Sequence, residues 1–286
     1  MAEYVFLNDK LVDAGKACVS VSDGGFLYGA GLFETMRSYN GVVFTLDEHL
    51  ERLLASAKAL SIEVSYDKEY LADAVYKLLK ANKLTDARIR MTVTGGSMSE
   101  AEKGKSTLLI TAVELQSYPD EYYQKGVQVV LCPFKQNVTD PTCGHKTLNY
   151  YSRILGLNLA HQKRAAEVLW FTPDNRLAEG CISNVFLVKD STLYTPTLDT
   201  PVLPGVTRKI ICEIAAENSV KLTEKDLYID DCLEADEIFM TNSVMQVMPV
   251  CKLEAHDIGD YKVGPITKKL IGCFDQYVKD NCRVNK

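Results

Sequence analysis

Hydrophobic and polar residues alternate along several short segments in the first part of the chain, and this period of two predicts β-strands. The Asn40-Gly41 dipeptide lies between two such segments and favours a hairpin. A stripe of leucines at helical spacing follows, and Thr45 with Glu48 predicts a capping box at its start. A second helix is expected over residues 67–81. The expected strands are Tyr4–Leu7, Lys10–Val12, Phe33–Tyr39, Val42–Phe44, Ala87–Thr94 and Thr107–Glu114.

Strand and helix patterns also mix in the second part of the chain, behind a polar stretch that is typical of a linker. The strands expected there are Val127–Cys132, Glu167–Phe171, Ile182–Val188 and Glu237–Thr241, and the helices are 150–163, 207–218 and 263–278. This succession predicts an α/β protein in which strands and helices are mixed as in the α+β class. We expect a small N-terminal domain over 1–117, a linker over 118–126 and a larger C-terminal domain over 127–286.

The composition narrows the class of protein. Of 286 residues, 47% are hydrophobic and 24% are charged, which is ordinary for a folded globular protein. The net charge of −6 argues against binding to nucleic acid or to an anionic membrane. No apolar run approaches the roughly 18 residues of a membrane span, and the first residues lack the pattern of a signal peptide. We therefore expect a cytoplasmic protein with no nucleic-acid partner and no membrane partner.

The nine cysteines and four histidines are scattered and lack the spacing of metal ligands. No metal site is expected. The cysteines are expected to be reduced thiols, as is usual in a reducing compartment.

Two basic residues stand in apolar surroundings. Arg52 interrupts the leucine stripe, where an arginine either pairs at the surface or binds a phosphate through its planar guanidinium. Lys146 precedes the helix expected from residue 150. It is either a solvated cation or a desolvated amine that can form a Schiff base with a carbonyl group.

An acidic residue and two small-residue turns complete the set of candidates. Glu179 precedes an apolar strand, where it is either exposed at a turn or buried beside a cation such as a protonated heterocyclic nitrogen. The segment 203–208 opens a helix, and Thr207 can cap it. The free N–H groups of such a helix start can bind phosphate, and the turn at 241–243 offers further donors.

Together and in this order, these segments resemble the fold-type IV enzymes that depend on pyridoxal 5′-phosphate. That group includes the D-amino acid and branched-chain aminotransferases and 4-amino-4-deoxychorismate lyase. The resemblance runs from about Tyr4 to Ile271. The motifs that carry it are YGAGLFETMR (28–37), HLERL (49–53), HKTLNY (145–150), AEGCISNVF (178–186), LPGVTR (203–208) and TNSVMQVMPV (241–250).

The resemblance implies a role for each matched residue. Lys146 would be catalytic, holding pyridoxal 5′-phosphate as a Schiff base and then moving the substrate Cα proton. Glu179 would pair with the ring nitrogen. The remaining cofactor contacts would come from Arg52, Tyr150, Leu203, Val206, Thr207, Asn242 and Ser243. Enzymes of this group are typically homodimers, so a homodimer is expected.

Substrate recognition is the point at which the motifs diverge. Arg88 and Arg90 alternate and should share one face of a buried strand. They would bind either the carboxylates of an amino acid and a keto acid, or carboxylates of the protein itself. The resemblance adds Tyr28 and Thr35 to the expected substrate contacts. Glu100 and Glu102 lie in the loop where the best-known D-amino acid enzymes carry a different carboxylate trap.

The doubled arginine favours an aminotransferase of the D-amino acid type, since a free α-carboxylate needs a cation. Asn149 follows Lys146 by three positions, as in the D-amino acid and lyase branches. Two other enzymes stay open: a 4-amino-4-deoxychorismate lyase, for which Thr35 is typical, and a branched-chain L-amino acid aminotransferase. A protein that binds the cofactor without catalysis is disfavoured by the intact set of lysine, glutamate and arginine.

Overall fold

The computed structural model describes residues 3–97 and 105–283. The chain divides into two compact units. The first comprises Met1–Gln116, His145–Asn149 and Lys279–Lys286, and the second comprises Ser117–Gly144 and Tyr150–Val278. The segment that carries Lys146 thus belongs to the first unit, although it lies among residues of the second along the chain.

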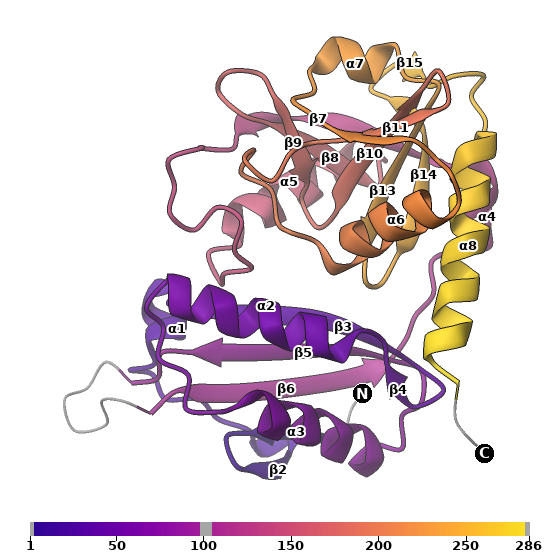
Figure 1. Ribbon diagram of the computed structural model, residues 1–286. Coiled ribbons are helices and arrows are strands. Elements are labelled where there is room, and N and C mark those ends of the chain that lie inside the picture. Colours follow the sequence, from indigo (N-terminus) through magenta and orange to yellow (C-terminus); the bar gives the residue numbers. More distant parts are fainter. Residues whose placement is uncertain (1–2, 98–104, 284–286) are drawn as a thin grey trace. The chain divides into compact units, whose positions relative to one another are not determined.

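The first unit is built on a six-stranded antiparallel sheet of order β2-β1-β6-β5-β3-β4 (Figure 1). Its strands are β1 (Tyr4–Leu7), β2 (Lys10–Asp13), β3 (Gly31–Tyr39), β4 (Val42–Val43), β5 (Ala87–Thr94) and β6 (Thr107–Glu114). Its helices are η1 (Ala14–Lys16), α1 (Gly24–Tyr28), α2 (Leu46–Ala59) and α3 (Lys68–Ala81). The bounds of β5 and β6 are those that the alternation predicts.

One face of this sheet is the core and the other is open. Met36, Ile89 and Met91 point to the same side and are fully buried in one cluster with the leucines of α2 and α3. The residues between them along the strands point to the other side, where Arg88 and Arg90 are exposed, Thr35 is half-buried and Phe33 is buried. The strict alternation in the sequence follows from this one-sided burial.

The expected capping box at Thr45 is wrong. Thr45 has a φ of 50°, in the left-handed region, and its side chain makes no hydrogen bond to the start of α2. The chain must turn sharply here to leave the β3–β4 hairpin, and this backbone conformation points the hydroxyl away from the free N–H groups. Asp47 and Glu48 still lie in the first turn, where a negative charge suits the helix dipole.

The second unit holds a larger mixed sheet of nine strands, whose main path is β12-β11-β10-β13-β14-β7-β8-β9, with β15 paired to β14 (Figure 1). The strands are β7 (Val127–Lys135), β8 (Glu167–Phe171), β9 (Leu177–Gly180), β10 (Asn184–Lys189), β11 (Thr192–Thr195), β12 (Leu222–Glu224), β13 (Glu237–Asn242), β14 (Gln246–Leu253) and β15 (His256–Asp257). The helices are α4 (Asp120–Lys125), α5 (Tyr151–Gln162), α6 (Val206–Glu217), α7 (Ile229–Leu233) and α8 (Pro265–Asn281).

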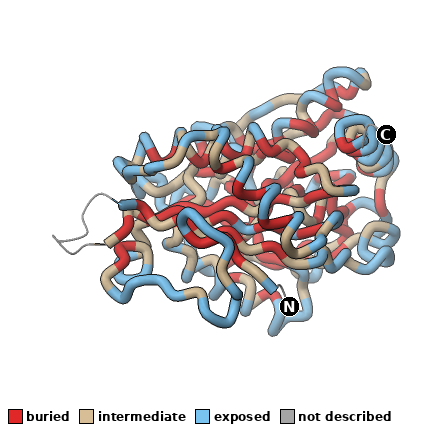
Figure 2. The backbone as a smooth tube through the Cα atoms, turned by 90° about the horizontal axis from the view of Figure 1, so that it is seen from below, coloured by how far each residue is buried: buried red, intermediate tan, exposed pale blue. Residues whose placement is uncertain are grey.

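The strands of the second unit are more deeply buried than those of the first. All five residues of β8 are buried, as are the first five of both β10 and β13. Phe186 and Phe239 stack at the centre with ring centroids 4.9 Å apart. Figure 2 shows buried residues on the inner segments of the chain and exposed ones mainly on the outer segments. Continuous burial explains why these strands read as apolar runs instead of alternating segments.

Several elements differ from those expected. Pro119 ends the extended chain and α4 follows it, so the expected linker over 118–126 contains a helix. Strands β9 and β14 were not expected. Both overlap motifs that indicate a functional site, AEGCISNVF (178–186) and TNSVMQVMPV (241–250). None of the helices within the described residues combines the length and the apolar character that a membrane span needs.

Candidate active site

The segment that carries Lys146 extends the first sheet at the edge of β3. Leu32 and Thr147 form an antiparallel bridge. The Phe33 N–H donates to the Lys146 carbonyl and the Leu148 N–H to the Gly31 carbonyl, both at 2.9 Å. On the side of α2, His145 Nδ1 and Ser56 Oγ lie 2.9 Å apart. The backbone on both sides of Lys146 is therefore held by the first unit.

The Lys146 amine lies beside an aromatic ring that it shares with an arginine. Its Nζ is 4.5 Å from the centre of the Phe33 ring, and the Cζ of Arg90 is 3.8 Å from the same centre. Arg90 is the cross-strand neighbour of Thr35. Thr35, Arg90 and Lys146, three residues that the sequence singles out or implies at three distant places in the chain, thus meet on the open face of the first sheet.

The two arginines of β5 share a face, as the alternation predicts, but that face is not buried. Both Arg88 and Arg90 are exposed within the first unit. The expectation of a buried strand is correct only for its other face, which packs on α2 and α3. Arg37 is paired with Arg88 across β3 and β5, so the open face carries three guanidinium groups.

Arg52 is fixed by a buried carboxylate that the sequence motifs did not single out. Its Nε donates to Glu34 Oε1 at 2.8 Å and its Nη2 to Glu34 Oε2 at 2.6 Å. His49 Nδ1 lies 2.8 Å from the same Oε2. Burial alone would raise the pKa of Glu34, but Arg52 and His49 together lower it to about 2. Burial lowers the pKa of His49, and the nearby Lys146 ammonium adds to that effect although Glu34 opposes it.

Tyr28 is the last residue of α1 and is 68% exposed. Its neighbours Val21, Phe26 and Leu27 are exposed hydrophobic residues as well. Among the described residues of the first unit, none covers this apolar surface. Glu100 and Glu102 lie outside the described residues.

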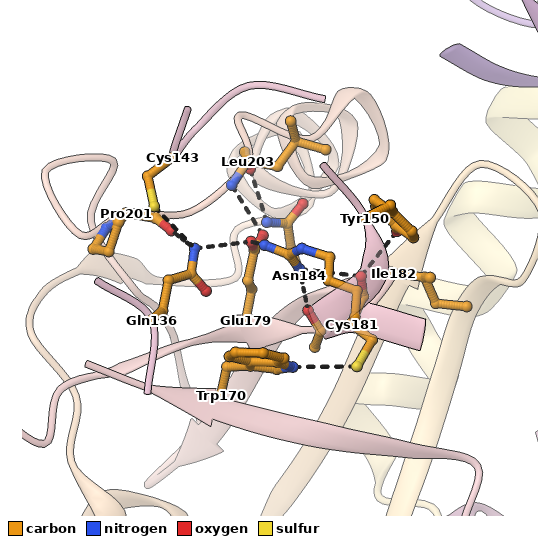
Figure 3. Close-up of polar contacts among 12 residues, drawn as sticks. Gln136, Cys143, Tyr150, Trp170, Glu179, Cys181, Ile182, Asn184, Pro201 and Leu203 are labelled. Atoms are coloured by element: carbon orange, nitrogen blue, oxygen red, sulfur yellow. Dashed lines mark hydrogen bonds and ion pairs between the residues drawn. The ribbon is translucent and has the colours of Figure 1, made fainter. Parts of the chain in front are cut away.

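In the second unit, Glu179 lies at the end of β9 and is buried (Figure 3). Its Oε2 accepts the Leu203 N–H at 2.9 Å, and its Oε1 accepts from Arg153 at 2.5 Å and from Gln136 at 3.4 Å. Of the two interpretations of Glu179, the buried one is therefore correct. Its contact with Leu203 joins two motifs through residues that lie 24 positions apart.

Tyr150 immediately precedes α5 and points toward the turn after β9 (Figure 3). Its hydroxyl donates to the Cys181 carbonyl at 3.0 Å. Burial raises the pKa of this phenol, with Arg153 opposing the shift. Tyr150 therefore contacts the backbone two residues after Glu179, at Cys181.

The start of α6 differs from the expectation in one detail. The N-cap is Gly205 instead of Thr207, and no side chain caps the helix. Val206 and Thr207 occupy the first turn and are both buried. Asn184 packs directly on the cap: its Nδ2 donates to the Leu203 carbonyl, and a Cβ on Gly205 would lie 1.9 Å from its Oδ1. An extended glycine therefore starts the helix and has no side chain of its own to cap the first N–H groups.

Asn242 and Ser243 belong to the hairpin between β13 and β14. The Asn242 Oδ1 accepts the N–H groups of Val244 and Met245, both at 2.8 Å. Its Nδ2 donates to the Ile182 carbonyl at 3.2 Å. The Asn242 side chain is therefore engaged in holding the turn. The adjacent Thr241 Oγ1 is buried and has no hydrogen-bond partner among the described residues.

The groups of each unit fit a phosphorylated heterocycle. The second unit presents a buried carboxylate for a cationic ring nitrogen and an uncapped helix start for a phosphate. The unpartnered hydroxyl of Thr241 is a further polar atom that such a ligand could satisfy. The first unit presents an amine beside an aromatic ring and an arginine held rigidly by Glu34.

Comparison with known proteins identifies the family. The model of the class IV aminotransferases matches residues 31–253, which is most of the chain. The chain therefore belongs to the class IV aminotransferases, the family that its motifs resemble.

Relatives with two different substrate assignments are similar over nearly the whole chain. A protein of Methanocaldococcus jannaschii, provisionally named a branched-chain-amino-acid aminotransferase, is 35% identical over 93% of both chains. The D-alanine aminotransferase of Listeria innocua is 30% identical over 97% of both chains. Among solved structures, the branched-chain amino acid aminotransferase of Escherichia coli superposes with a TM-score of 0.93 at 26% identity, covering 100% of this chain and 97% of that one.

Proposed function

We propose that this aminotransferase moves an amino group between a D-amino acid and a 2-keto acid. The cofactor is pyridoxal 5′-phosphate, in keeping with the family. When bound, it supplies an aldehyde that takes up the amino group and a ring that accepts electrons from the substrate Cα.

In this proposal the residues named by the motifs hold the cofactor. Lys146 carries the aldehyde and moves the proton at the substrate Cα. Glu179 keeps the ring nitrogen protonated, and Leu203 and Tyr150 contact the ring. Phosphate is bound by residues of three motifs, Arg52, Val206 with Thr207, and Ser243, and Asn242 is a further cofactor contact beside Ser243. The uncapped start of α6 and the anchoring of Arg52 by Glu34 support these assignments.

The observation that carries the substrate proposal is the pair of cations on the Phe33 ring. Lys146 Nζ and Arg90 Cζ both lie within 5 Å of its centre, at 4.5 and 3.8 Å. An α-amino acid carries its carboxylate one bond from Cα, so a substrate whose Cα is near Lys146 has its carboxylate within reach of Arg90. Arg88 is then available for a second carboxylate, as in a dicarboxylic acid such as 2-oxoglutarate.

The polarity of this face favours the D-amino acid type over the branched-chain type. Thr35, Arg88 and Arg90 line the open face next to Phe33, and Arg37 continues it. A site for a branched aliphatic side chain needs apolar walls, and charged guanidinium groups line this face instead.

We also propose a homodimer. Val21, Phe26 and Tyr28 are 79%, 74% and 68% exposed and lie close together along the chain. A soluble protein rarely leaves such residues in water, and a second copy of the chain is the simplest cover. In a dimer Tyr28 would be available to contact substrate. A cytoplasmic location is proposed on the nine free thiols.

A donor screen tests the function. The full chain, loaded with pyridoxal 5′-phosphate, is incubated with D-alanine, D-glutamate or D-aspartate and with L-isoleucine, L-leucine or L-valine, using 2-oxoglutarate and pyruvate as acceptors. We expect kcat/KM for a D-amino acid to exceed that for any L-amino acid by about a hundredfold, which is about 3 kcal/mol of discrimination. Higher activity with a branched L-amino acid would refute the proposal. Release of 4-aminobenzoate from 4-amino-4-deoxychorismate, without transamination, would support the lyase instead.

A further inference from the structure

An arginine that lies outside the expected site residues contacts Glu179. Arg153 is the third residue of α5, and its Nη2 lies 2.5 Å from Glu179 Oε1. Its Nη1 donates to the carbonyl oxygens of Gly180 and Cys181, at 2.9 and 3.1 Å. One guanidinium therefore holds both the carboxylate and the backbone that follows it.

A close approach of α5 to the end of β9 makes this contact possible. A Cβ on Gly156, one helical turn after Arg153, would lie 2.6 Å from Cys181 Sγ, so only glycine fits at that position. Trp170 Nε1 donates to the same sulfur at 3.2 Å (Figure 3). The Tyr150 hydroxyl reaches the Cys181 carbonyl from just before the helix. Arg153 is thus placed by contacts before and after it on the same side of its helix.

This contact pairs a buried carboxylate with a cation. The Glu179 side chain is 4% exposed and that of Arg153 is 23% exposed. A carboxylate buried to this extent is strongly disfavoured as an anion unless a cation lies beside it. Within the described part of the second unit, Arg153 supplies that cation.

The hydrogen bonds also determine how the carboxylate is oriented. A carboxylate offers about four acceptor positions, two on each oxygen. Both positions of Oε1 are directed at donors, Arg153 and Gln136. Oε2 accepts one bond, from the Leu203 N–H, and keeps one position for a further donor.

We propose that Arg153 is a positioning residue for Glu179: it keeps the carboxylate ionised and fixes its rotation, so that the remaining acceptor position on Oε2 receives the N–H of the cofactor ring. This inference rests on the proposed function, in which Glu179 pairs with the ring nitrogen. The inference adds Arg153 as the residue that determines how strongly Glu179 pairs with the ring nitrogen. A lysine would keep the charge but could not bond the carboxylate and two carbonyls at once with the same planar geometry.

The test compares two cofactors that differ only at the ring nitrogen. Cofactor-free full chain is titrated with pyridoxal 5′-phosphate and with its 1-deaza analogue, in which a carbon replaces the ring nitrogen. The measured quantity is the ratio of the two dissociation constants, analogue over natural cofactor. We expect Arg153→Met to lower this ratio by at least about tenfold and Arg153→Lys by about threefold. Arg176→Met, which removes a surface arginine paired with Asp174 and Asp226, should leave it unchanged.

Each outcome is informative because a loss of structure affects both cofactors alike. Equal weakening of both cofactors in Arg153→Met, with an unchanged ratio, would overturn the inference. Should that variant not fold, the ratio in Arg153→Lys decides: a lower ratio supports the inference and an unchanged one overturns it. Glu179→Gln separates this inference from the proposed function. If Glu179→Gln lowers the ratio and the Arg153 variants do not, only the role of Arg153 is refuted. If Glu179→Gln leaves the ratio unchanged, the pairing of Glu179 with the ring nitrogen is itself refuted.

Discussion

Glu34 holds the guanidinium of Arg52 through two nearly parallel hydrogen bonds, from Nε to Oε1 at 2.8 Å and from Nη2 to Oε2 at 2.6 Å. The carboxylate lies on the core side of β3 and is 1% exposed. An arginine on a helix surface is ordinarily mobile, and this contact removes its rotamer freedom before any ligand binds.

Glu34→Gln should lower the free energy of unfolding by about 3 kcal/mol at neutral pH, because it leaves a buried guanidinium without an anion. The size of the loss should shrink as the pH falls. The pKa of Glu34 is about 2, below its usual 4.5, so its stabilising effect is present above pH 4.5 and is lost as the pH falls from 4.5 to 2. Urea unfolding of both proteins over this range measures the difference. Glu121→Gln, which breaks an exposed pair with Lys125, should cost less than about 0.5 kcal/mol. A loss that does not depend on pH would contradict the ionic explanation.

Glu167 should make the stability depend on pH in the direction opposite to that of Glu34. It is fully buried, and burial raises its pKa to about 7 although the Ile182 N–H and the Ser183 hydroxyl stabilise the anion. The folded chain therefore holds this proton more tightly than the unfolded chain. The free energy of unfolding should decline as the pH rises from 4.5 to 7, by about 3 kcal/mol at most.

Glu167→Gln should remove this decline and make the protein more stable than the wild type above pH 7. Thermal unfolding at a series of pH values provides the measurement. Glu217→Gln, at the exposed end of α6, serves as the control and should follow the wild-type curve. A wild-type curve that is flat between pH 4.5 and 7 would show that Glu167 titrates normally.

Gly205→Ala should destabilise the second unit by about 2–4 kcal/mol through overpacking. The φ of Gly205 is −67°, which suits any residue, so the cost is not backbone strain. The new Cβ would displace the Asn184 side chain and break its hydrogen bond to the Leu203 carbonyl. Gly272→Ala is the matched control, since no atom lies within 4 Å of its Cβ, and in the middle of α8 it should stabilise by about 0.5–1 kcal/mol. Similar melting temperatures for the two variants would contradict this packing.

Lys146→Ala should abolish transamination while leaving the protein folded. The backbone bonds of Lys146 to β3 do not involve its side chain, so the antiparallel bridge is retained. Circular dichroism and size-exclusion chromatography check the fold and the oligomer, and keto acid formation checks activity. Lys209→Ala, whose side chain is 62% exposed on α6, should remain fully active. Substantial residual turnover in Lys146→Ala would remove it from the mechanism.

Arg90→Ala should raise KM for the amino donor by about tenfold, since it removes a cation from the substrate carboxylate. The dissociation constant of the cofactor should change little. Arg37→Ala provides a comparison, because Arg37 lies on the same open face but over Tyr39, at 4.3 Å from that ring. Equal losses of cofactor affinity and substrate affinity in Arg90→Ala would indicate a structural role.

Local patterns in the sequence predict those parts of the fold that local energetics determine. The bounds of β5, β6 and β8 match the expectation, and α3 begins after Asp67, whose side chain caps it as an acceptor. The helix α2 begins after Thr45 as expected, but the capping box is wrong because Thr45 has a left-handed conformation, which composition does not reveal.

The candidate site divides in the same way. Glu179 and Lys146 stand out through their motifs, whereas Glu34 and Arg153 escape notice because their partners lie 18 and 26 residues away along the chain. A signal for Arg153 does exist: it follows Tyr150 by three positions, so both occupy one side of the start of α5. The burial of a charged residue depends on which elements pack together, and a single sequence does not reveal that packing.

The bridge between Leu32 and Thr147 also bears on how this protein is synthesised. The two residues are separated by 115 positions, so the ribosome releases the whole of the first sheet long before the lysine emerges. The edge of β3 must then stay uncovered until the later segment arrives, which exposes unpaired backbone groups to other nascent chains. Aggregation during expression should therefore originate at this edge, and truncations that end before residue 145 should be the least soluble products.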